Sequence, residues 1–240
     1  MESYSKFFQF YDLVMGDRSD AANYIRDLVA LYQPEAKTLL EIACGTGGLL
    51  GRFSESYDVT GLDRSRPMLA IARKRLPQIP LLQQDMTSFR IDRRFDAIVC
   101  AFDSINHVHR FPDWKKTFHC VAAHLNAGGV FVFDVNTIGK LQRLVKGPPW
   151  VKQFGLDLVI IKVNGGRTNL FTWDVKIFEQ RQRDNYKLIG ETIEEMAFPM
   201  RRILTSLRRY FRQVKVFDPE GARPSDRSER LYFVCKARRA

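Results

Sequence analysis

A glycine-rich segment with an acidic residue on each side is the part of this sequence best suited to chemistry. The segment is Cys44-Gly45-Thr46-Gly47-Gly48, and Glu41 precedes it in an apolar stretch. Because glycine has no Cβ, its backbone can turn sharply and approach a ligand closely. Asp63 follows about 20 residues on, where an acidic side chain can accept hydrogen bonds from both hydroxyls of a ribose. The pattern predicts a site for a ligand that contains a nucleoside.

The spacing of small residues argues against a dinucleotide as that ligand. The dinucleotide fingerprint Gly-x-Gly-x-x-Gly/Ala needs a third small residue, and counted from Gly45 that position holds Leu50. Glu41 would also repel a pyrophosphate but attract an ammonium group. We therefore expect a nucleoside ligand that carries an ammonium.

These residues resemble a known family. Glu41-x-Ala43-Cys44-Gly45-Thr46-Gly47, followed by Asp63, is similar to the first two motifs of class I S-adenosylmethionine-dependent methyltransferases. Ala43 stands where the family more often has glycine, although alanine occurs in its small-molecule branch, which includes sugar-nucleotide N-methyltransferases and uncharacterised bacterial members. The alternative is a glycine turn that serves only a tight connection between strand and helix. The resemblance implies S-adenosyl-L-methionine as cofactor and S-adenosyl-L-homocysteine as product.

The resemblance also implies roles for individual residues. Glu41 would hold the methionine end through the backbone of the turn and a bridging water, and Asp63 would hold the ribose. Asp85 would hydrogen-bond the adenine amino group while Met86 packs on the ring. The complete set of expected cofactor-binding residues is Tyr11, Glu41, Ala43, Gly45, Gly47, Asp63, Arg64, Met68, Asp85, Met86, Phe102 and Asp103.

The start of the chain carries a pattern of aromatic residues. Residues 3–15 are expected to form an amphipathic helix, and Phe7-x-x-x-Tyr11-Asp12-x-x-Met15 resembles the lid helix of small-molecule methyltransferases. This resemblance implies that Tyr11 lies near the transferred methyl group. The alternative is that the aromatic side chains only cover the edge of the sheet.

The candidate catalytic residues follow the most apolar strand. Residues 95–102 form a continuous apolar run, as expected of a strand buried on both faces, and Asp103-Ser104-Ile105-Asn106-His107 comes next. Polar residues at the carboxyl end of such a strand face the ligand crevice of an open α/β sheet. His107 is the candidate general base, since imidazole titrates near neutral pH, and Asn106 is the second catalytic candidate. The alternative is a loop histidine that only shapes the pocket.

The elements needed to position these residues predict an α/β fold. We expect a Rossmann-like, seven-stranded, mostly parallel sheet with helices on both faces and an antiparallel β insertion after the fifth strand. Besides the two strands that flank the glycine turn, the expected strands are 79–84, 95–102, 130–135, 214–217 and 231–236, the last one antiparallel at the end of the sheet. Residues 126–129 are expected to form the turn before the fifth strand. The other expected helices are 20–32, 64–76, 112–125 and 200–211.

We divide the chain into three parts. Residues 1–145 are the expected cofactor-binding core with its lid helix, and 199–240 supply the last helix and the last two strands of the core sheet. Between them, 146–198 contain three extended segments (156–163, 170–180 and 186–196). We expect this insertion to form a cap that selects the substrate.

Composition restricts the class of protein. With 45% hydrophobic and 27% charged residues among 240, disorder is not indicated. No apolar run approaches the roughly 18 residues of a membrane span, and no secretory leader is recognisable, so we expect a cytoplasmic protein without a membrane partner. The four cysteines form no Cys-x-x-Cys pair, and His119 and His124 are badly spaced for joint ligation on a helix. We therefore expect no metal.

The charge of the chain leaves an alternative open. The net charge is +11, and from Pro199 to Ala240 there are 12 basic residues against 4 acidic ones. This excess is either a solvated face or a patch for phosphate-bearing substrates or nucleic acid. An RNA methyltransferase is the corresponding alternative, but the motifs Asn-Pro-Pro-Tyr and Asp-Pro-Pro-Tyr are absent after the fourth strand.

A regulator that binds S-adenosylmethionine without catalysis is a further alternative. We favour transfer of a methyl group to an N or O atom of a small polar acceptor; the oligomeric state stays open.

Overall fold

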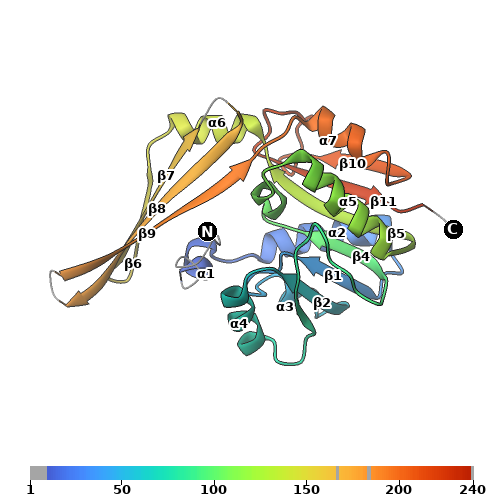
Figure 1. The fold of residues 1–240 in the computed structure, drawn as a ribbon, viewed down its shortest axis with the longest axis horizontal. Coiled ribbons are helices and arrows are strands. Elements are labelled where there is room, and N and C mark those ends of the chain that lie inside the picture. Colours follow the sequence, from blue (N-terminus) through green and yellow to red (C-terminus); the bar gives the residue numbers. More distant parts are fainter. Residues whose placement is uncertain (1–9, 166–167, 183–184, 239–240) are drawn as a thin grey trace.

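The core of the protein is a seven-stranded sheet with the order β10-β11-β5-β4-β1-β2-β3 (Figure 1). The computed structural model describes residues 10–165, 168–182 and 185–238. The core strands are β1 (Thr38–Ile42), β2 (Asp58–Asp63), β3 (Leu81–Gln83), β4 (Phe95–Cys100), β5 (Leu125–Asn136), β10 (Gln213–Phe217) and β11 (Arg230–Lys236). Strands β1 to β5 pair in parallel, and β11 pairs antiparallel with both β5 and β10. The predicted Rossmann-like sheet is confirmed.

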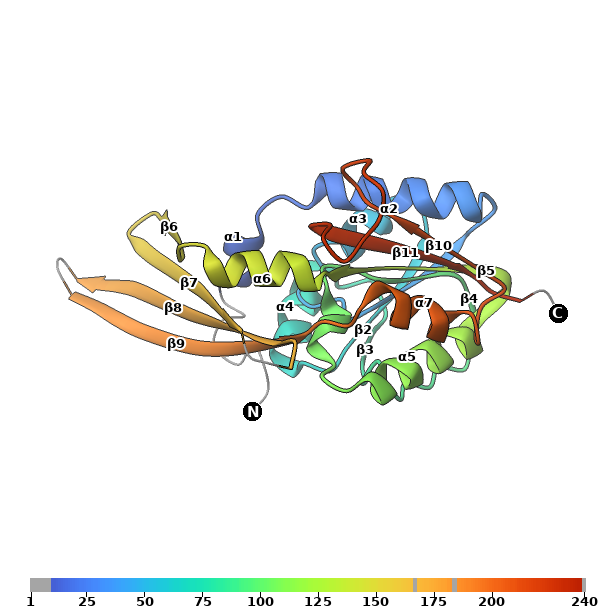
Figure 2. The same ribbon diagram turned by 90° about the horizontal axis from the view of Figure 1, so that it is seen from above.

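Helices cover both faces of this sheet (Figure 2). On the core sheet they are α2 (Ser19–Tyr32), α3 (Leu50–Phe53), α4 (Arg66–Arg75), α5 (Phe111–His124) and α7 (Met200–Leu207), whereas α1 (Tyr11–Met15) and α6 (Ile138–Lys146) pack against a second sheet. Side chains alternate between the two faces of each strand. Leu39 therefore packs in the cluster of α2, α3 and α4, whereas Leu40 packs in the cluster of α5 and α7.

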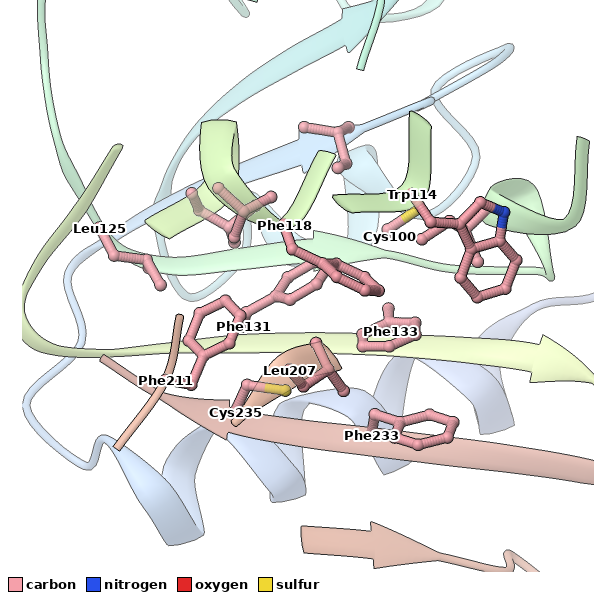
Figure 3. Close-up of a cluster of buried hydrophobic side chains, with 14 of the residues drawn as sticks. Cys100, Trp114, Phe118, Leu125, Phe131, Phe133, Leu207, Phe211, Phe233 and Cys235 are labelled. Carbon is pink, nitrogen blue, oxygen red and sulfur yellow. The ribbon is translucent and has the colours of Figure 1, made fainter. Parts of the chain in front are cut away.

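Aromatic side chains fill the face under α5 and α7 (Figure 3). Phe133 of β5 stacks on Phe131 of the same strand and on Phe233 of β11, with ring centroids 4.8 Å apart in both pairs. Trp114 of α5 is fully buried beside them, and its indole Nε1–H donates to Val108 O at 2.7 Å. The core therefore fixes the loop that follows β4, which carries the candidate catalytic residues.

A second, antiparallel sheet follows β5 and α6 and projects from one end of the core (Figure 1). Its strands are β6 (Trp150–Phe154), β7 (Asp157–Gly165), β8 (Leu170–Gln182) and β9 (Asn185–Met196), in that order. The predicted insertion after the fifth strand is confirmed. Phe10 packs into the apolar cluster of β7, β8 and β9 beside Tyr11 and Val14, so the second sheet holds the α1 segment.

Several local predictions were wrong. No strand was expected over β6 and no helix over α6, whose start is capped by the Thr137 hydroxyl accepting from Lys140 N at 3.0 Å. The turn expected at 126–129 is a bulge inside β5, because the pairing with β4 jumps from Leu125 to Val130. The strand expected to reach residue 102 ends at Cys100, and α7 ends at Leu207 rather than at 211.

The position of the last strand also differs from the prediction. β11 is antiparallel as expected, but it lies between β5 and β10, so β10 forms the edge of the sheet. The helix expected over 3–15 is described only from Tyr11 to Met15, since 3–9 lie outside the described residues. No helix in the described ranges combines the length and the apolar character needed to cross a lipid bilayer.

Candidate active site

Gly45 and Gly47, in the turn after β1, have different structural roles. Gly45 and Gly47 both have positive φ, at 55° and 76°, a conformation that glycine adopts without strain. A Cβ on Gly45 would meet only Tyr11 Cε1, at 3.9 Å, and Gly45 lines a cavity. A Cβ on Gly47 would lie 2.8 Å from Leu76 Cδ1. Gly45 therefore allows close approach to the cavity, whereas Gly47 allows the turn to pack on the end of α4.

Asp63 ends β2 beside this turn, since β1 and β2 are neighbours in the sheet. Its Oδ2 accepts from Gly45 N at 2.8 Å and its Oδ1 accepts from Ser65 N at 2.7 Å. Burial raises the pKa of the Asp63 carboxyl, against the opposing effect of these backbone hydrogen bonds. The carboxylate is thus held in one orientation at the cavity wall, as a ribose-binding group requires.

Two buried groups of opposite charge lie beside the turn. Glu41 is 3% exposed, and its Oε2 has no hydrogen-bond partner among the described residues. Burial raises the pKa of Glu41 well above the usual range, and the charge of Arg18 opposes this shift. Arg18 is also buried, with an unpartnered Nε, and its guanidinium lies 5.0 Å from the ring centroid of Tyr11. Unsatisfied buried polar atoms are uncommon in proteins and suggest a missing partner.

Asp12 links the lid segment to the glycine turn and to α4. Its Oδ1 accepts from Thr46 Oγ1 and from Arg18 Nη2, both at 2.7 Å, and its Oδ2 pairs with Arg75. Arg75 Nη1 also donates to Thr46 O at 3.1 Å. Burial tends to raise the pKa of Asp12, but the hydrogen bonds from Thr46 and Arg75 lower it overall. We call Asp12, Arg18, Thr46 and Arg75 the lid clamp.

The opposite end of the cavity is formed after β3. Asp85 and Met86 line it as predicted, together with Met68 of α4. Asp85 Oδ1 accepts from the backbone N and the hydroxyl of Thr87, at 2.8 and 2.7 Å. The turn that follows therefore orients the Asp85 carboxylate. The Met86 thioether is next to it in the chain, and a methionine side chain packs well on an aromatic ring.

The segment after β4 has an unusual backbone. Phe102 and Asp103 both have positive φ, at 54° and 49°, which is uncommon for residues other than glycine. Asp103 N donates to Asp134 Oδ2 at 2.9 Å, and the Asp103 carboxylate pairs with Arg230 Nη2 at 2.6 Å. Arg230 also pairs with Asp134. These ionic contacts hold the segment so that Phe102 lines the cavity, while Asp103 does not line it.

His107 lies in the short 3-10 helix Ser104–His107 and lines the cavity. Its Nδ1 is 2.9 Å from Glu194 O. Because a carbonyl can only accept, Nδ1 carries the proton, which makes Nε2 the basic nitrogen of the neutral ring. Burial lowers the pKa of His107, so the ring is neutral near pH 7.

Asn106 is placed differently from its prediction. It is fully buried and does not line the cavity. Its Nδ2 donates to Asn136 O at 3.2 Å and to Met196 O at 3.1 Å, and its Oδ1 accepts from Asn136 N at 3.2 Å. These bonds tie the segment after β4 to β5 and to the end of β9. The geometry therefore gives Asn106 a positioning role instead of a catalytic one.

The cavity has a volume of about 530 Å³, which is within the range of small-molecule sites. Of the predicted residues, it brings together Tyr11, Ala43, Gly45, Asp63, Arg64, Met68, Asp85, Met86, Phe102 and His107. Glu41, Gly47, Asp103 and Asn106 are not on its wall. Sequence reasoning missed the residues Leu62, Ser65, Gln84, Thr87, Ser104, Val108, His109, Arg110, Asp113 and Glu194. Most of these adjoin predicted residues in the chain, which is a usable signal, but nothing in the sequence points to Glu194 or Arg18.

One group of residues has the composition of a metal site. Ligand atoms of Asp103, His107 and Glu195 lie within 4.8 Å of one another. Asp103 pairs with Arg230, however, and Glu195 Oε2 accepts from Asn136 Nδ2 at 2.9 Å. Lys140 and Arg230 also exert their positive charges on Glu195. The group is a hydrogen-bonded ionic network, and these cations disfavour a metal ion there.

Comparison with known proteins agrees with this geometry. Residues 39–129 match the family described as methyltransferase domain. The putative methyltransferase YqeM of Bacillus subtilis (strain 168) is 30% identical over 210 residues, which cover 85% of each chain. The chain belongs to the class I methyltransferases. A solved S-adenosylmethionine-dependent methyltransferase from Clostridium acetobutylicum ATCC 824 superimposes with a TM-score of 0.84 at 25% identity, covering 98% of this chain and 99% of that one.

A stronger match is confined to part of the chain. The dTDP-3-amino-3,4,6-trideoxy-alpha-D-glucopyranose N,N-dimethyltransferase of Streptomyces venezuelae is 41% identical over 119 residues, which cover 49% of this chain and 50% of that one. This chain spans about half the length of the amino-sugar methyltransferases it matches. In this methyltransferase, the residues that match the family model, 39–129, include the glycine turn and Asp63.

The residues of the cavity fit the cofactor of the family. S-adenosylmethionine carries an ammonium and a carboxylate at one end, a ribose in the middle and an adenine at the other end. Glu41 and Arg18 do not line the cavity, but each has an unpartnered buried atom, an acceptor on Glu41 and a donor on Arg18, that suits the first end. Asp63 is held for the ribose, and Asp85 and Met86 form the far end.

Proposed function

We propose that this methyltransferase transfers a methyl group from S-adenosylmethionine to a nitrogen atom of a small polar acceptor. The observation that carries the proposal is the cavity beside the glycine turn, where Gly45 N holds Asp63. Outside its wall, Glu41 and Arg18 each keep an unpartnered buried atom. The name of the Streptomyces venezuelae relative, an N,N-dimethyltransferase of an amino sugar nucleotide, supports nitrogen as the acceptor atom. The reaction is proposed to take place in the cytoplasm.

Positioning is the main task of the protein in this reaction. When bound, the cofactor supplies a sulfonium methyl group that is already strongly electrophilic. Correct alignment of two reactants can account for about 7 to 11 kcal/mol of a barrier. We assign this task to Asp63 and Asp85, which fix the two ends of the nucleoside, and to the lid clamp, which holds Tyr11 over Gly45.

His107 is proposed as the general base. An amine that gains a methyl group must lose a proton, and a positioned base contributes about 10²- to 10⁴-fold to such a step. The Glu194 carbonyl accepts from Nδ1–H, so Nε2 is the atom that would take the proton. Because burial lowers the pKa of His107, the ring is already unprotonated near pH 7.

The insertion of residues 146–198 is proposed to act as the substrate cap. It contributes Glu194 to the cavity wall, where His109 Nδ1 lies 3.6 Å from Glu194 Oε2. Arg110 and Asp113 also line the cavity. Carboxylates in this wall would attract a cationic amine, and Arg110 would suit an anionic part of the same acceptor.

Binding of S-adenosylhomocysteine, measured by titration calorimetry, tests the cofactor half of the proposal. We expect micromolar affinity in the unmodified protein, a large loss in Asp63→Ala, and no binding of NAD. Transfer of a labelled methyl group to a panel of amino-sugar nucleotides and small amines tests the other half. Absence of S-adenosylhomocysteine binding would refute the proposal, and binding without any turnover would favour a regulator instead.

A further inference from the structure

A second cavity lies outside the active site, in the groove between α5 and α7. These two helices run side by side on the same face of the core sheet (Figure 2), and Arg202 Cζ of α7 lies 4.2 Å from the ring centroid of Phe111 of α5. The groove has a volume of about 480 Å³ and shares no lining residue with the active-site cavity. We call it the α5–α7 groove.

The lining of the α5–α7 groove is strongly basic. It contains Lys115, Arg201, Arg202 and Arg209, and no carboxylate. Within the described ranges, none of these four side chains forms an ion pair within 4.0 Å. Lys115 and Arg202 both lie over the ring of Phe111, which keeps two positive charges at the groove. Like charges held together without a counter-charge repel each other, and a bound anion would relieve this repulsion.

The floor of the α5–α7 groove contains a polar atom without a partner. Ser206 is 4% exposed and lines the groove, and its Oγ has no hydrogen-bond partner among the described residues. A serine inside a helix commonly bonds the carbonyl four residues earlier, as Thr205 Oγ1 does with Arg201 O at 2.9 Å. The Ser206 hydroxyl is therefore left with an unused hydrogen bond beside the groove.

We propose that the α5–α7 groove binds the phosphate groups of a small phosphorylated molecule. Arginine presents its N–H donors in a planar fork that matches the oxygens of a phosphate group. A single carboxylate has only two oxygens, which is too few to accept from four cationic side chains and a hydroxyl. The volume of the groove, about 480 Å³, suits a small ligand. This site is separate from methyl transfer and does not depend on it.

The test is calorimetric titration of the full chain with inorganic pyrophosphate, at low salt and with saturating S-adenosylhomocysteine. We expect saturable binding that weakens as salt is added. Arg209→Ala should weaken pyrophosphate binding about tenfold, the factor that corresponds to one ion pair of about 1.4 kcal/mol. The matched control is Arg208→Ala, since Arg208 is its exposed neighbour on the same segment but does not line the groove.

Ser206→Ala gives a second, independent readout. Because the hydroxyl has no partner in the protein, its removal should leave the unfolding temperature unchanged or raise it, while pyrophosphate binding weakens. A nucleoside diphosphate should bind at the same site and lose affinity in the same variants. Comparing the affinities of the nucleoside diphosphate and of pyrophosphate shows whether the groove prefers a phosphate attached to a nucleoside or the free ion.

Four outcomes would overturn the proposal. They are the absence of pyrophosphate binding, an equal loss in Arg208→Ala and Arg209→Ala, succinate binding as tightly as pyrophosphate, and displacement of pyrophosphate from the unmodified protein by S-adenosylhomocysteine. Tight binding of single-stranded RNA that pyrophosphate does not displace, with loss in Arg209→Ala, would assign the groove to nucleic acid instead.

Discussion

Glu41 is a buried carboxyl group whose hydrogen bonding is incomplete in the ligand-free protein. Its carboxylate is buried, one oxygen has no partner among the described residues, and burial raises its pKa well above the usual range. In the unfolded chain a glutamate ionises near pH 4.3 (about the model-peptide value). As the pH rises through that value, the unfolded chain releases a proton that the folded chain keeps. Glu41 therefore lowers the stability of the ligand-free protein as the pH rises towards neutrality.

Glu41→Gln is expected to stabilise the ligand-free protein at pH 7.5, by about 1 to 3 kcal/mol. The gain should shrink as the pH falls to 4, where the carboxyl is mostly protonated in both states. The free energy of unfolding in urea, measured at the two pH values, checks this expectation. The same variant should bind S-adenosylhomocysteine more weakly, because the carboxylate proposed to serve its ammonium end is gone. An equal gain at both pH values would contradict the account.

His107→Gln is expected to lower kcat by about 10²- to 10⁴-fold and to leave S-adenosylhomocysteine binding unchanged. In the unmodified enzyme, the acid limb of the pH profile of kcat should lie below pH 6.5 (about the usual histidine pKa), because burial lowers the pKa of His107. The limb should be missing from the residual activity of the variant. A variant that keeps both kcat and the limb would reduce His107 to a residue that shapes the pocket.

At the scale of elements, α1 depends on contacts with other parts of the chain. It has five residues, and a helix of that length is not stable by itself in water. The lid clamp joins it to the glycine turn and α4, and Phe10, Tyr11 and Val14 pack against the second sheet. Tyr11 is therefore positioned over Gly45 from two sides.

Asp12→Asn should loosen α1 and weaken S-adenosylhomocysteine binding about tenfold, since the amide loses the ion pairs with Arg18 and Arg75. Asp17→Asn is the matched control, because Asp17 also pairs with an arginine, Arg52, but is exposed, and exposed pairs contribute little. Calorimetry of the two variants at pH 7 provides the comparison. Since Asp12 has a lowered pKa, its contribution to stability is present above the usual aspartate pKa and lost as the pH falls through the lowered value.

At the scale of the whole molecule, two sheets contribute to one cavity. The core sheet supplies Asp63 and Asp85, whereas β9 of the second sheet supplies Glu194. Asn106 joins the two by bonding both Asn136 O and Met196 O. Under our proposal, the core therefore serves the cofactor and the second sheet serves the acceptor.

Glu194→Gln is expected to raise KM for an amine acceptor about tenfold while S-adenosylhomocysteine affinity stays the same. The reason is that the neutral amide no longer attracts a cationic amine. Glu179→Gln is a suitable control, because Glu179 belongs to the same sheet but pairs with Arg181 outside the cavity. Steady-state kinetics with a fixed cofactor concentration measures the difference. A parallel loss of S-adenosylhomocysteine binding would contradict the division between the two sheets.

The sequence alone determined that the glycine turn meets Asp63, because this contact is local. Gly45 and Asp63 stand on the two sides of one βαβ unit, and the pairing of neighbouring parallel strands brings them together wherever such a unit folds. Residue type and spacing within a short segment were sufficient to predict these two positions. Asp85 and Met86 were predicted instead from the resemblance to the methyltransferase family, because such a pair in a turn carries no signal alone.

Only the tertiary structure decided the remainder, because it depends on contacts between segments far apart in the chain. Nothing near Asn106 in the sequence shows that its amide bonds to Asn136 and Met196, or that β11 inserts between β5 and β10. Arg18 and Glu194 likewise reach their places through the packing of the start of α2 and of β9, which follows from burial of apolar side chains over the whole molecule. Such packing depends on the total shape of the core, and no local pattern of residues encodes it.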